Sequence, residues 1–338
     1  MNNSLTAFQL LKRHIDSSFL YYKSLLPISE QFAYDSIVTG LLKYEKKIRI
    51  KKLDFPTLER IIEMIRLDIP GLFFIKDFTF YQYGALREVI PNYRFSKIKA
   101  ANIISAIYDT VQDFKNTYSE CNDTKKVTAV HDLLCKNIKY NDKNFDADHE
   151  CVGPLLYRSG VCEGISKAAK LLLDCLGVQS ILIRGKTVNS NSDYLFDSHM
   201  WNIVKNDNLF YHLDITFDLS LMEYSVIRYD YFCLSDTQIR KDHFYKDDMP
   251  KCNCNWNYYE KCGMSFTSLK IFKQYIRSQI EKGKNNMVFQ IPTKRFAANV
   301  SIMKDNIVQI ISFYPKIIDF EIFQNDKSGV CHLHLRMR

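Results

Sequence analysis

GVCEG at residues 160–164 opens the stretch that decides the fold, which continues through SHMWN (198–202) and ends with HLDITFD (212–218). The stretch supplies a cysteine, a histidine and an aspartate in that order, each at the edge of an expected helix or strand. A thiol, an imidazole and a carboxylate are the components of a thiol catalytic triad. We therefore interpret Cys162, His199 and Asp214 as candidate catalytic residues.

Cys162 is expected at the first turn of a helix. The turn signal Ser159-Gly160 precedes it, apolar residues recur at three- and four-residue steps over 164–176, and Gly177 is a natural stop. Unpaired backbone N–H groups and the positive end of the helix dipole favour a thiolate at this position. The alternative is a buried structural cysteine, which is the interpretation we give to Cys175 on the same helix.

His199 and Asp214 are expected on neighbouring strands, because 198–204 and 209–215 both have strand character and 205–208 is a turn. A two-residue loop at Asn206-Asp207 would pair His199 directly with Asp214, with Cβ atoms about 5 Å apart. The carboxylate would then fix the imidazole tautomer and leave the other ring nitrogen for the thiol. The alternative is a surface His–Asp pair.

The three blocks resemble those of the transglutaminase-like superfamily, the papain-related group with a Cys–His–Asp triad. Its bacterial members typically carry G-V-C-x-G-x-A, H-x-W-N and D-x-T-W-D, and the likeness extends over about residues 125–220. Ser166 stands here in place of the frequent Ala, and Phe217 in place of the frequent Trp. The resemblance implies an α+β fold whose core packs the nucleophile helix on an antiparallel sheet. Members include protein cross-linkers, thiol peptidases, peptide N-glycanases and inactive binding modules, so the reaction stays open.

The main hypothesis is a thiol acyl-transfer enzyme that acts on peptide or side-chain amides, either a cysteine peptidase or amidase or a protein-glutamine transglutaminase. Cys162 would attack the carbonyl, His199 would move the proton, and Asp214 would orient His199. The backbone N–H of Cys162 would contribute to an oxyanion hole. Tyr157, Gly164 and Trp201 are further candidates for oxyanion or substrate contacts.

Two alternatives come from other classes. One is a catalytically silent transglutaminase-like module that binds protein. The other is a metal protein that uses Cys252, Cys254, Cys262 and a histidine, although a C-x-C pair with one further cysteine is a weak zinc signal. His332 and His334 alternate on an expected strand and could form a metal pair. Under the main hypothesis we expect no metal and no cofactor, since thiol acyl transfer needs none.

Composition indicates a soluble globular protein, and the resemblance implies a protein or peptide substrate. The 338 residues include 46 Lys and Arg against 38 Asp and Glu, a net charge of +8 that is scattered, so we expect no nucleic-acid partner. Residues 1–20 lack the pattern of a signal peptide, and no apolar stretch predicts a membrane span. The 10 cysteines lack dense spacing, which favours reduced thiols and a cytoplasmic location. The oligomeric state is left open.

We expect three parts along the chain. Residues 1–100 would form an N-terminal α/β region, residues 101–262 the catalytic core, and residues 263–338 a small C-terminal α/β domain. In the core, two helices are expected over 100–140, and the loop at 141–150 is expected near the cleft. The loop at 185–197 would either shape the substrate groove or be a plain surface connection. In the last part, a helix at 269–282, a strand at 288–291, a helix at 295–313 and a hairpin at 317–336 are expected.

Overall fold

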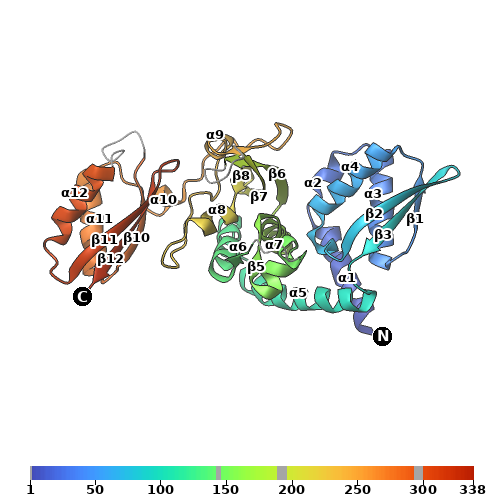
Figure 1. Cartoon of the computed structure of the whole chain (residues 1–338), viewed down its shortest axis with the longest axis horizontal. Coiled ribbons are helices and arrows are strands. Elements are labelled where there is room, and N and C mark those ends of the chain that lie inside the picture. Colours follow the sequence, from blue (N-terminus) through green and yellow to red (C-terminus); the bar gives the residue numbers. More distant parts are fainter. Residues whose placement is uncertain (1, 142–145, 189–195, 293–299) are drawn as a thin grey trace.

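The structure is a computed structural model that describes residues 2–141, 146–188, 196–292 and 300–338. Helices and strands form three parts that follow one another along the longest axis of the molecule (Figure 1). Antiparallel sheets combined with helices make the fold α+β, as predicted. The predicted loops at 141–150 and 185–197 lie partly outside the described residues.

The first part contains a three-stranded antiparallel sheet in the order β1-β3-β2, with helices beside it. This confirms the expected mixture of helices and strands in this region. Its elements are α1 (Asn2–Ser17), α2 (Tyr21–Ser24), α3 (Ile28–Lys43), β1 (Ile48–Lys51), α4 (Phe55–Asp68), the 3₁₀ turn η1 (Pro70–Leu72), β2 (Ile75–Tyr83) and β3 (Leu86–Tyr93).

The middle part contains a four-stranded sheet in the order β8-β7-β6-β9, on which α7 packs. The two helices expected over 100–140 are confirmed as α5 and α6. The elements are α5 (Lys97–Tyr118), α6 (Asp123–Asn137), β4 (Lys139–Tyr140), η2 (Asp146–His149), η3 (Gly153–Tyr157), β5 (Ser159–Gly160), α7 (Cys162–Cys175), β6 (Ser180–Val188), β7 (Phe196–Asn206), β8 (Leu209–Leu213), α8 (Ile215–Ser220), α9 (Asp236–Ile239), β9 (His243–Phe244) and α10 (Tyr258–Lys261).

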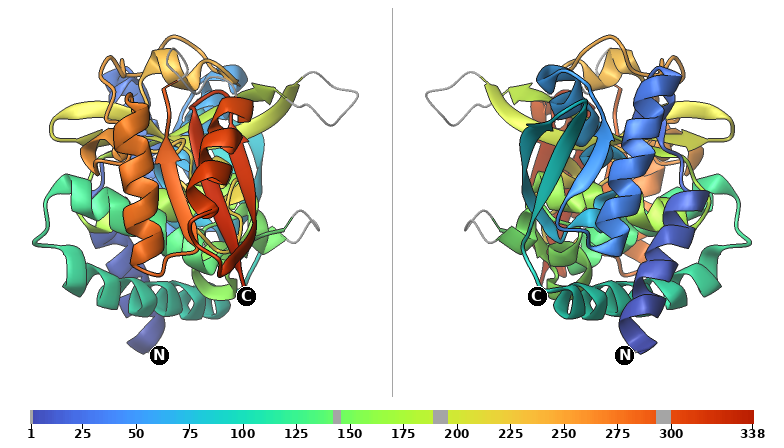
Figure 2. Two further views of the ribbon diagram at one scale, coloured as in Figure 1. Left: turned by 90° about the vertical axis from the view of Figure 1, so that its left-hand side faces the viewer. Right: turned by 90° about the vertical axis from the view of Figure 1, so that its right-hand side faces the viewer.

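The last part is a three-stranded antiparallel sheet in the order β10-β12-β11, with α11 and α12 over one face (Figures 1 and 2). The predicted helices, strand and hairpin are confirmed where the residues are described. The elements are α11 (Leu269–Glu281), β10 (Asn286–Gln290), α12 (Val300–Ile311), β11 (Ile317–Asn325) and β12 (Val330–Met337).

Two large apolar clusters stabilise these parts. One runs from Ala7 to Cys233 and includes side chains of both the N-terminal region and the core, and the other lies within residues 266–335. The first two parts therefore share buried surface, while the last has a core of its own. The boundaries at 100 and 262 stay predictions. Among the described helices, none combines the length and the apolar character needed to cross a bilayer.

Helix α7 is tied to the sheet one turn after Cys162. The hydroxyl of Ser166 donates to the backbone carbonyl of Met200 at 2.9 Å, and the amide of Asn202 donates to the carbonyl of Ser166 at 3.1 Å. Ser166 and Asn202 are both almost completely buried, where an unpaired polar group would be costly. These bonds fix the start of α7 against the part of β7 that contains His199.

The turn between β7 and β8 differs from the predicted one. Asp207 and Asn208 occupy it, with φ of 47° and 65°, and Asn206 pairs with Leu209. Two-residue hairpin turns of this kind need positive φ at both central residues, which Asn and Asp tolerate. The run Asn-Asp-Asn offers two such pairs, so the sequence pattern alone does not choose between them.

The predicted direct pairing of His199 with Asp214 was therefore wrong. Strand β8 ends at Leu213, and Asp214 begins helix α8 instead of continuing the ladder. The register is displaced by two positions, and a displacement of two keeps each side chain on the same face of a sheet. Asp214 accordingly still lies on the side of His199.

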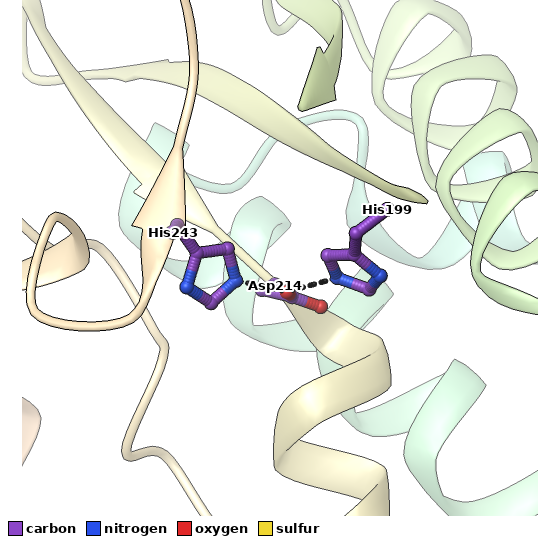
Figure 3. Close-up of side chains that lie close together, drawn as sticks. All are labelled: His199, Asp214 and His243. Carbon is purple, nitrogen blue, oxygen red and sulfur yellow. Dashed lines mark hydrogen bonds and ion pairs between the residues drawn. The ribbon is translucent and has the colours of Figure 1, made fainter. Parts of the chain in front are cut away.

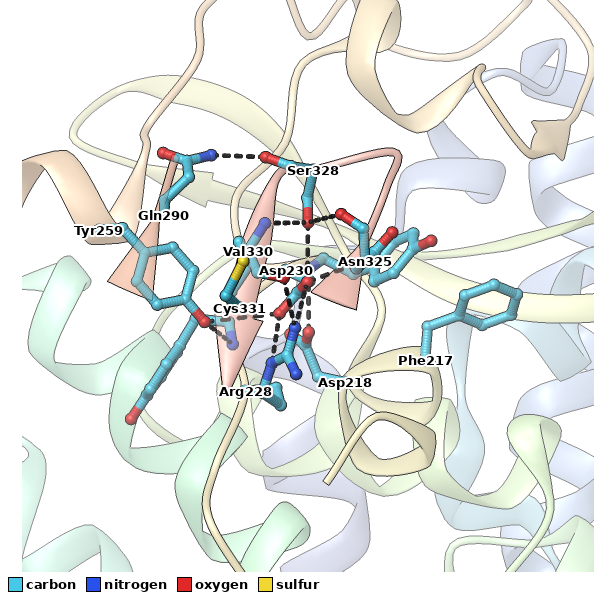
Figure 4. A network of polar contacts seen from close by, with 12 residues as sticks. Phe217, Asp218, Arg228, Asp230, Tyr259, Gln290, Asn325, Ser328, Val330 and Cys331 are labelled. Carbon is cyan, nitrogen blue, oxygen red and sulfur yellow. Dashed lines mark hydrogen bonds and ion pairs between the residues drawn. The ribbon is translucent and has the colours of Figure 1, made fainter. Parts of the chain in front are cut away.

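A buried polar network joins the C-terminal domain to the core (Figure 4). Arg228 binds both carboxylate oxygens of Asp230 at 2.9 Å. Asn325 and Ser328, from the turn between β11 and β12, donate to the same carboxylate at 3.1 and 2.8 Å. A buried charge needs several such partners, so the hairpin of β11 and β12 supplies hydrogen bonds that the Arg228–Asp230 pair in the middle part requires.

Gly164 permits the close contact between α7 and η2. A Cβ built on Gly164 would lie 2.1 Å from the backbone oxygen of Asp148, and a backbone atom cannot rotate away as a side chain can. We expect Gly164→Ala to lower the free energy of unfolding by roughly 1–3 kcal/mol, as overpacking does, in urea denaturation. Helix propensity alone favours alanine by roughly 0.5–1 kcal/mol, so a stabilised variant would contradict this packing.

Candidate functional site

Cys162 is the first residue of α7. Its predecessor Val161 is the N-cap and makes no side-chain capping bond, so the first N–H groups of the helix are not capped by a side chain. Cys162 is partly exposed and lines a cleft together with His199. The thiol therefore lies at the positive end of a helix dipole in a place that a substrate can reach.

His199 lies between Cys162 and Asp214. Its Nε2 is 2.6 Å from the Oδ2 of Asp214 (Figure 3), and Cys162 lines the same cleft, where its sulfur favours the charged imidazole. Since Nε2 is used by the carboxylate, Nδ1 is the ring atom that remains for the sulfur. The structure thus brings together the three predicted side chains.

Asp214 is held by the start of α8. It is the N-cap of that helix, and its Oδ1 accepts the backbone N–H of Phe217 at 3.1 Å. The residue is 1% exposed. An N-cap aspartate is among the preferred ways to begin a helix, so one side chain both caps α8 and orients His199.

The charges of the site stabilise one another. Burial disfavours the charged imidazole of His199, but the carboxylate of Asp214 and the sulfur of Cys162 favour it, and the pKa of His199 rises to about 10. Burial disfavours the carboxylate of Asp214 as well, yet the neighbouring imidazoles of His199 and His243 lower its pKa well below the usual range. At neutral pH the site therefore holds an imidazolium beside the sulfur.

Two other cysteines lie beside histidines, but neither arrangement suits a nucleophile. Cys135 is 3.6 Å from His131 in the interior, where burial raises the pKa of the thiol. Cys175 is 3.2 Å from His14. Burial raises the pKa of the Cys175 thiol to about 12 and lowers the pKa of His14 to about 4. Burial thus opposes the thiolate form of both Cys135 and Cys175, as expected of structural cysteines.

A family model named for the transglutaminase-like superfamily matches residues 111–215, which include all three side chains. These residues belong to the transglutaminase-like superfamily. The matched segment contains α6, α7 and the sheet strands β6 to β8, so the transglutaminase-like domain is the part of the chain that builds the cleft. No curated protein matches the sequence.

Three solved structures are similar to parts of the chain. A candidate cysteine protease from Cytophaga hutchinsonii has 12% identity and a TM-score of 0.28 over 41% of this chain and 61% of its own. A TGase has 11% identity and a TM-score of 0.30 over 60% and 56%. A candidate protease from Parabacteroides distasonis has 12% identity and a TM-score of 0.26 over 40% and 35%. The alignments thus span less than two thirds of each of these proteins, and the family assignment rests on the family model.

Four more side chains line the cleft of the transglutaminase-like domain: Tyr140, His149, Glu163 and Arg184. Sequence reasoning expected the loop at 141–150, which contains His149, near the groove, but it did not assign the other three to the cleft. Their contribution depends on η2, β4 and β6 meeting the start of α7, which no local pattern encodes. His243 was missed for a similar reason. It belongs to a strand of two residues, too short to produce an alternating pattern.

The three further candidates for substrate or oxyanion contacts do not lie in contact positions. Tyr157 lines a separate cavity. Gly164 faces the backbone of Asp148 and is buried. Trp201 is fully buried, donates from its indole nitrogen to His212, and lies beneath the ring of His199 with centroids 5.8 Å apart. Gly164 and Trp201 thus lie inside the domain, whereas Tyr157 is 62% exposed outside the cleft, and none of the three lines the cleft of Cys162 and His199.

The proposed four-ligand metal site is not assembled. Cys252 lies near His212 and Asp236, whereas Cys254 and Cys262 are exposed and join no cluster of ligands among the residues that the structure describes. Trp201 donates to Nδ1 of His212, so the neutral ring carries its proton on Nε2 and donates to Asp236. A protonated nitrogen has no lone pair for a metal. His332 and His334 both contact Asn286 through its side-chain oxygen.

The raised pKa of His199 depends on Asp214. We expect Asp214→Asn to move the deprotonation of His199 from about pH 10 toward or below the ordinary imidazole value of about 6.5, because burial then acts without the opposing carboxylate. The measurement is the rate of Cys162 alkylation by anionic iodoacetate relative to neutral iodoacetamide, which falls when the imidazolium loses its charge. An unchanged pH dependence would show that Asp214 does not set the charge of His199.

Proposed function

We propose that the chain is a cysteine acyl-transfer enzyme that acts on amide bonds of proteins or peptides, with Cys162 as nucleophile. The observation that supports this is the joint position of three groups. Cys162 stands at a helix start in an open cleft that His199 also lines, and the Nε2 of His199 is bound by a buried carboxylate.

The chemistry proceeds in two stages. The sulfur of Cys162 attacks the amide carbonyl carbon, and the N–H groups at the start of α7 stabilise the oxyanion that forms. His199 gives its proton to the departing amine as the carbon–nitrogen bond breaks, leaving a thioester. In the second stage His199 takes a proton from the acceptor, which attacks the thioester; the carbon–sulfur bond breaks and Cys162 leaves as the thiolate beside the imidazolium.

Water is the acceptor that the cleft favours. Cys162 and His199 line a cleft that opens to solvent, and amine transfer needs water to be kept away from the thioester. We therefore assign hydrolysis as the reaction, with an amine acceptor as the alternative outcome of the experiment below.

A polypeptide substrate fits the shape of this surface. The cleft, of about 380 Å³, shares His149, Glu163 and Arg184 with a second cavity of about 320 Å³ that extends toward α4 and β2. Arg184 pairs with Glu163 where the two meet. Each volume lies in the range of a ligand pocket, so the two together can accommodate an extended chain on one side of the scissile bond.

Turnover should depend entirely on the sulfur of Cys162. We expect Cys162→Ala to abolish release of a fluorophore from a library of peptide amides, a loss of at least about 10³-fold, as for other activated nucleophiles. The exposed Cys262 provides the matched control, and Cys262→Ala should retain full activity.

The same assay run with and without a fluorescent alkylamine distinguishes the acceptors. Release of free acid in both cases supports hydrolysis, whereas covalent incorporation of the amine supports cross-linking. Wild-type protein that performs neither reaction, and whose Cys162 is alkylated no faster than Cys262 at pH 6, would instead support the silent binding module.

A further inference from the structure

His243 binds the side of Asp214 opposite His199. Its Nε2 is 2.9 Å from the same Oδ2 atom that accepts from His199 (Figure 3). Strand β9 pairs with β6 and places His243 there, 0% exposed. One carboxylate oxygen of Asp214 is therefore shared by two imidazoles. The second imidazole, that of His243, belongs to none of the sequence motifs and has no part in the proposed mechanism.

The partners of His243 define its charge. Nδ1 is 2.6 Å from Oδ1 of Asp242, so both ring nitrogens face carboxylate oxygens. A carboxylate only accepts hydrogen bonds, and the pKa of Asp214 and of Asp242 is lowered. Both nitrogens of His243 must therefore carry protons, which makes the ring an imidazolium. Burial opposes this charge, but the two carboxylates raise the pKa of His243.

The groups around His243 keep this arrangement in place. The hydroxyl of Tyr231 donates to Asp242 at 2.5 Å, and Lys327, from the turn between β11 and β12, binds the same carboxylate at 3.0 Å. The remaining neighbours are aromatic: the rings of Trp201 and Phe217 lie 5.0 and 4.6 Å from that of His243. Among the described residues, Asp214 and Asp242 thus form ion pairs with the rings of His199 and His243, and with one further cation, Lys327.

We propose that His243 is a positioning residue of the triad: its imidazolium shares Oδ2 of Asp214 with His199 and so limits how strongly Asp214 stabilises the charged form of His199. This rests on the proposed function, in which the charged His199 must give the proton on its Nδ1 to the departing amine. Phe217 still holds the other oxygen of Asp214. Loss of His243 would therefore leave Asp214 in place and strengthen its bond to His199.

His199, Asp214 and His243 also lie close enough together to suggest a cation site. The contacts argue against it. Each Nε2 lies at direct hydrogen-bond distance from Oδ2, and the other nitrogen of His243 is bound by Asp242. A ligating Nε2 would have to give up its proton and make room for an ion about 2.0–2.2 Å away.

The test uses the full chain with His243→Gln, which removes the charge and keeps a hydrogen-bond donor of similar length. The iodoacetate to iodoacetamide rate ratio at Cys162 reports the charge of His199 without any substrate. We expect the pH at which this ratio falls to rise by about one unit, a tenfold gain in proton affinity. The turnover number for peptide amides should drop with little change in KM, because a weaker acid protonates the leaving amine more slowly.

A purely structural role would loosen the site and leave the pH dependence unchanged or lower it, and either result would overturn the proposal. Nitrogen-15 NMR of the histidines in the wild-type protein gives a second measurement that does not depend on how the variant folds. His243 should remain doubly protonated from pH 5 to pH 9, and a neutral ring in that range would also overturn the proposal. Absence of turnover in wild type, with the shift present, would reject only the proposed function.

Discussion

Asp214 is an anion in the interior of the protein, and the site depends on how its charge is compensated. Three N–H donors surround it: the rings of His199 and His243, and the backbone of Phe217. A buried carboxylate without such partners would take up a proton or destabilise the fold. The hydrogen bonds that compensate the buried charge of Asp214 also fix the ring of His199, which faces Cys162. Stability and the proposed chemistry are therefore properties of one arrangement.

The second constraint is the distance between helix α7, which begins with Cys162, and strand β7, which contains His199. Cys162 and His199 come from different elements, and they meet because Ser166 and Asn202 join α7 to β7 close to both. Gly164 allows η2 to approach the same end of the helix. Several residues of the three sequence blocks thus have a structural function, since they set the position of a thiol relative to an imidazole.

The fold class and the meeting of the three central side chains could be predicted because they follow from local patterns. The periodicity of 164–176 places Cys162 at a helix start, and two strands joined by a short turn place His199 near Asp214. The details failed where the sequence is ambiguous or the contact is remote. Asn206-Asp207-Asn208 allows two positions of the turn. Trp201 was a candidate for substrate contact, but its burial against His212 depends on how the strands pair, which the local sequence does not give. His243 comes from a segment without periodicity, so its place beside Asp214 is visible only in three dimensions.

The buried pair of Arg228 and Asp230 has a consequence for synthesis of the protein. Its partners Asn325 and Ser328 are encoded about a hundred residues later, and chains emerge from the ribosome in order, so the core is translated before the groups that close over it. Lys327, on the same turn, reaches Asp242 at the same time. A nascent chain that has made only the triad would still have two carboxylates open to water. In the proposed site, Asp242 would therefore lack its lysine partner until the hairpin of β11 and β12 has been made and has docked.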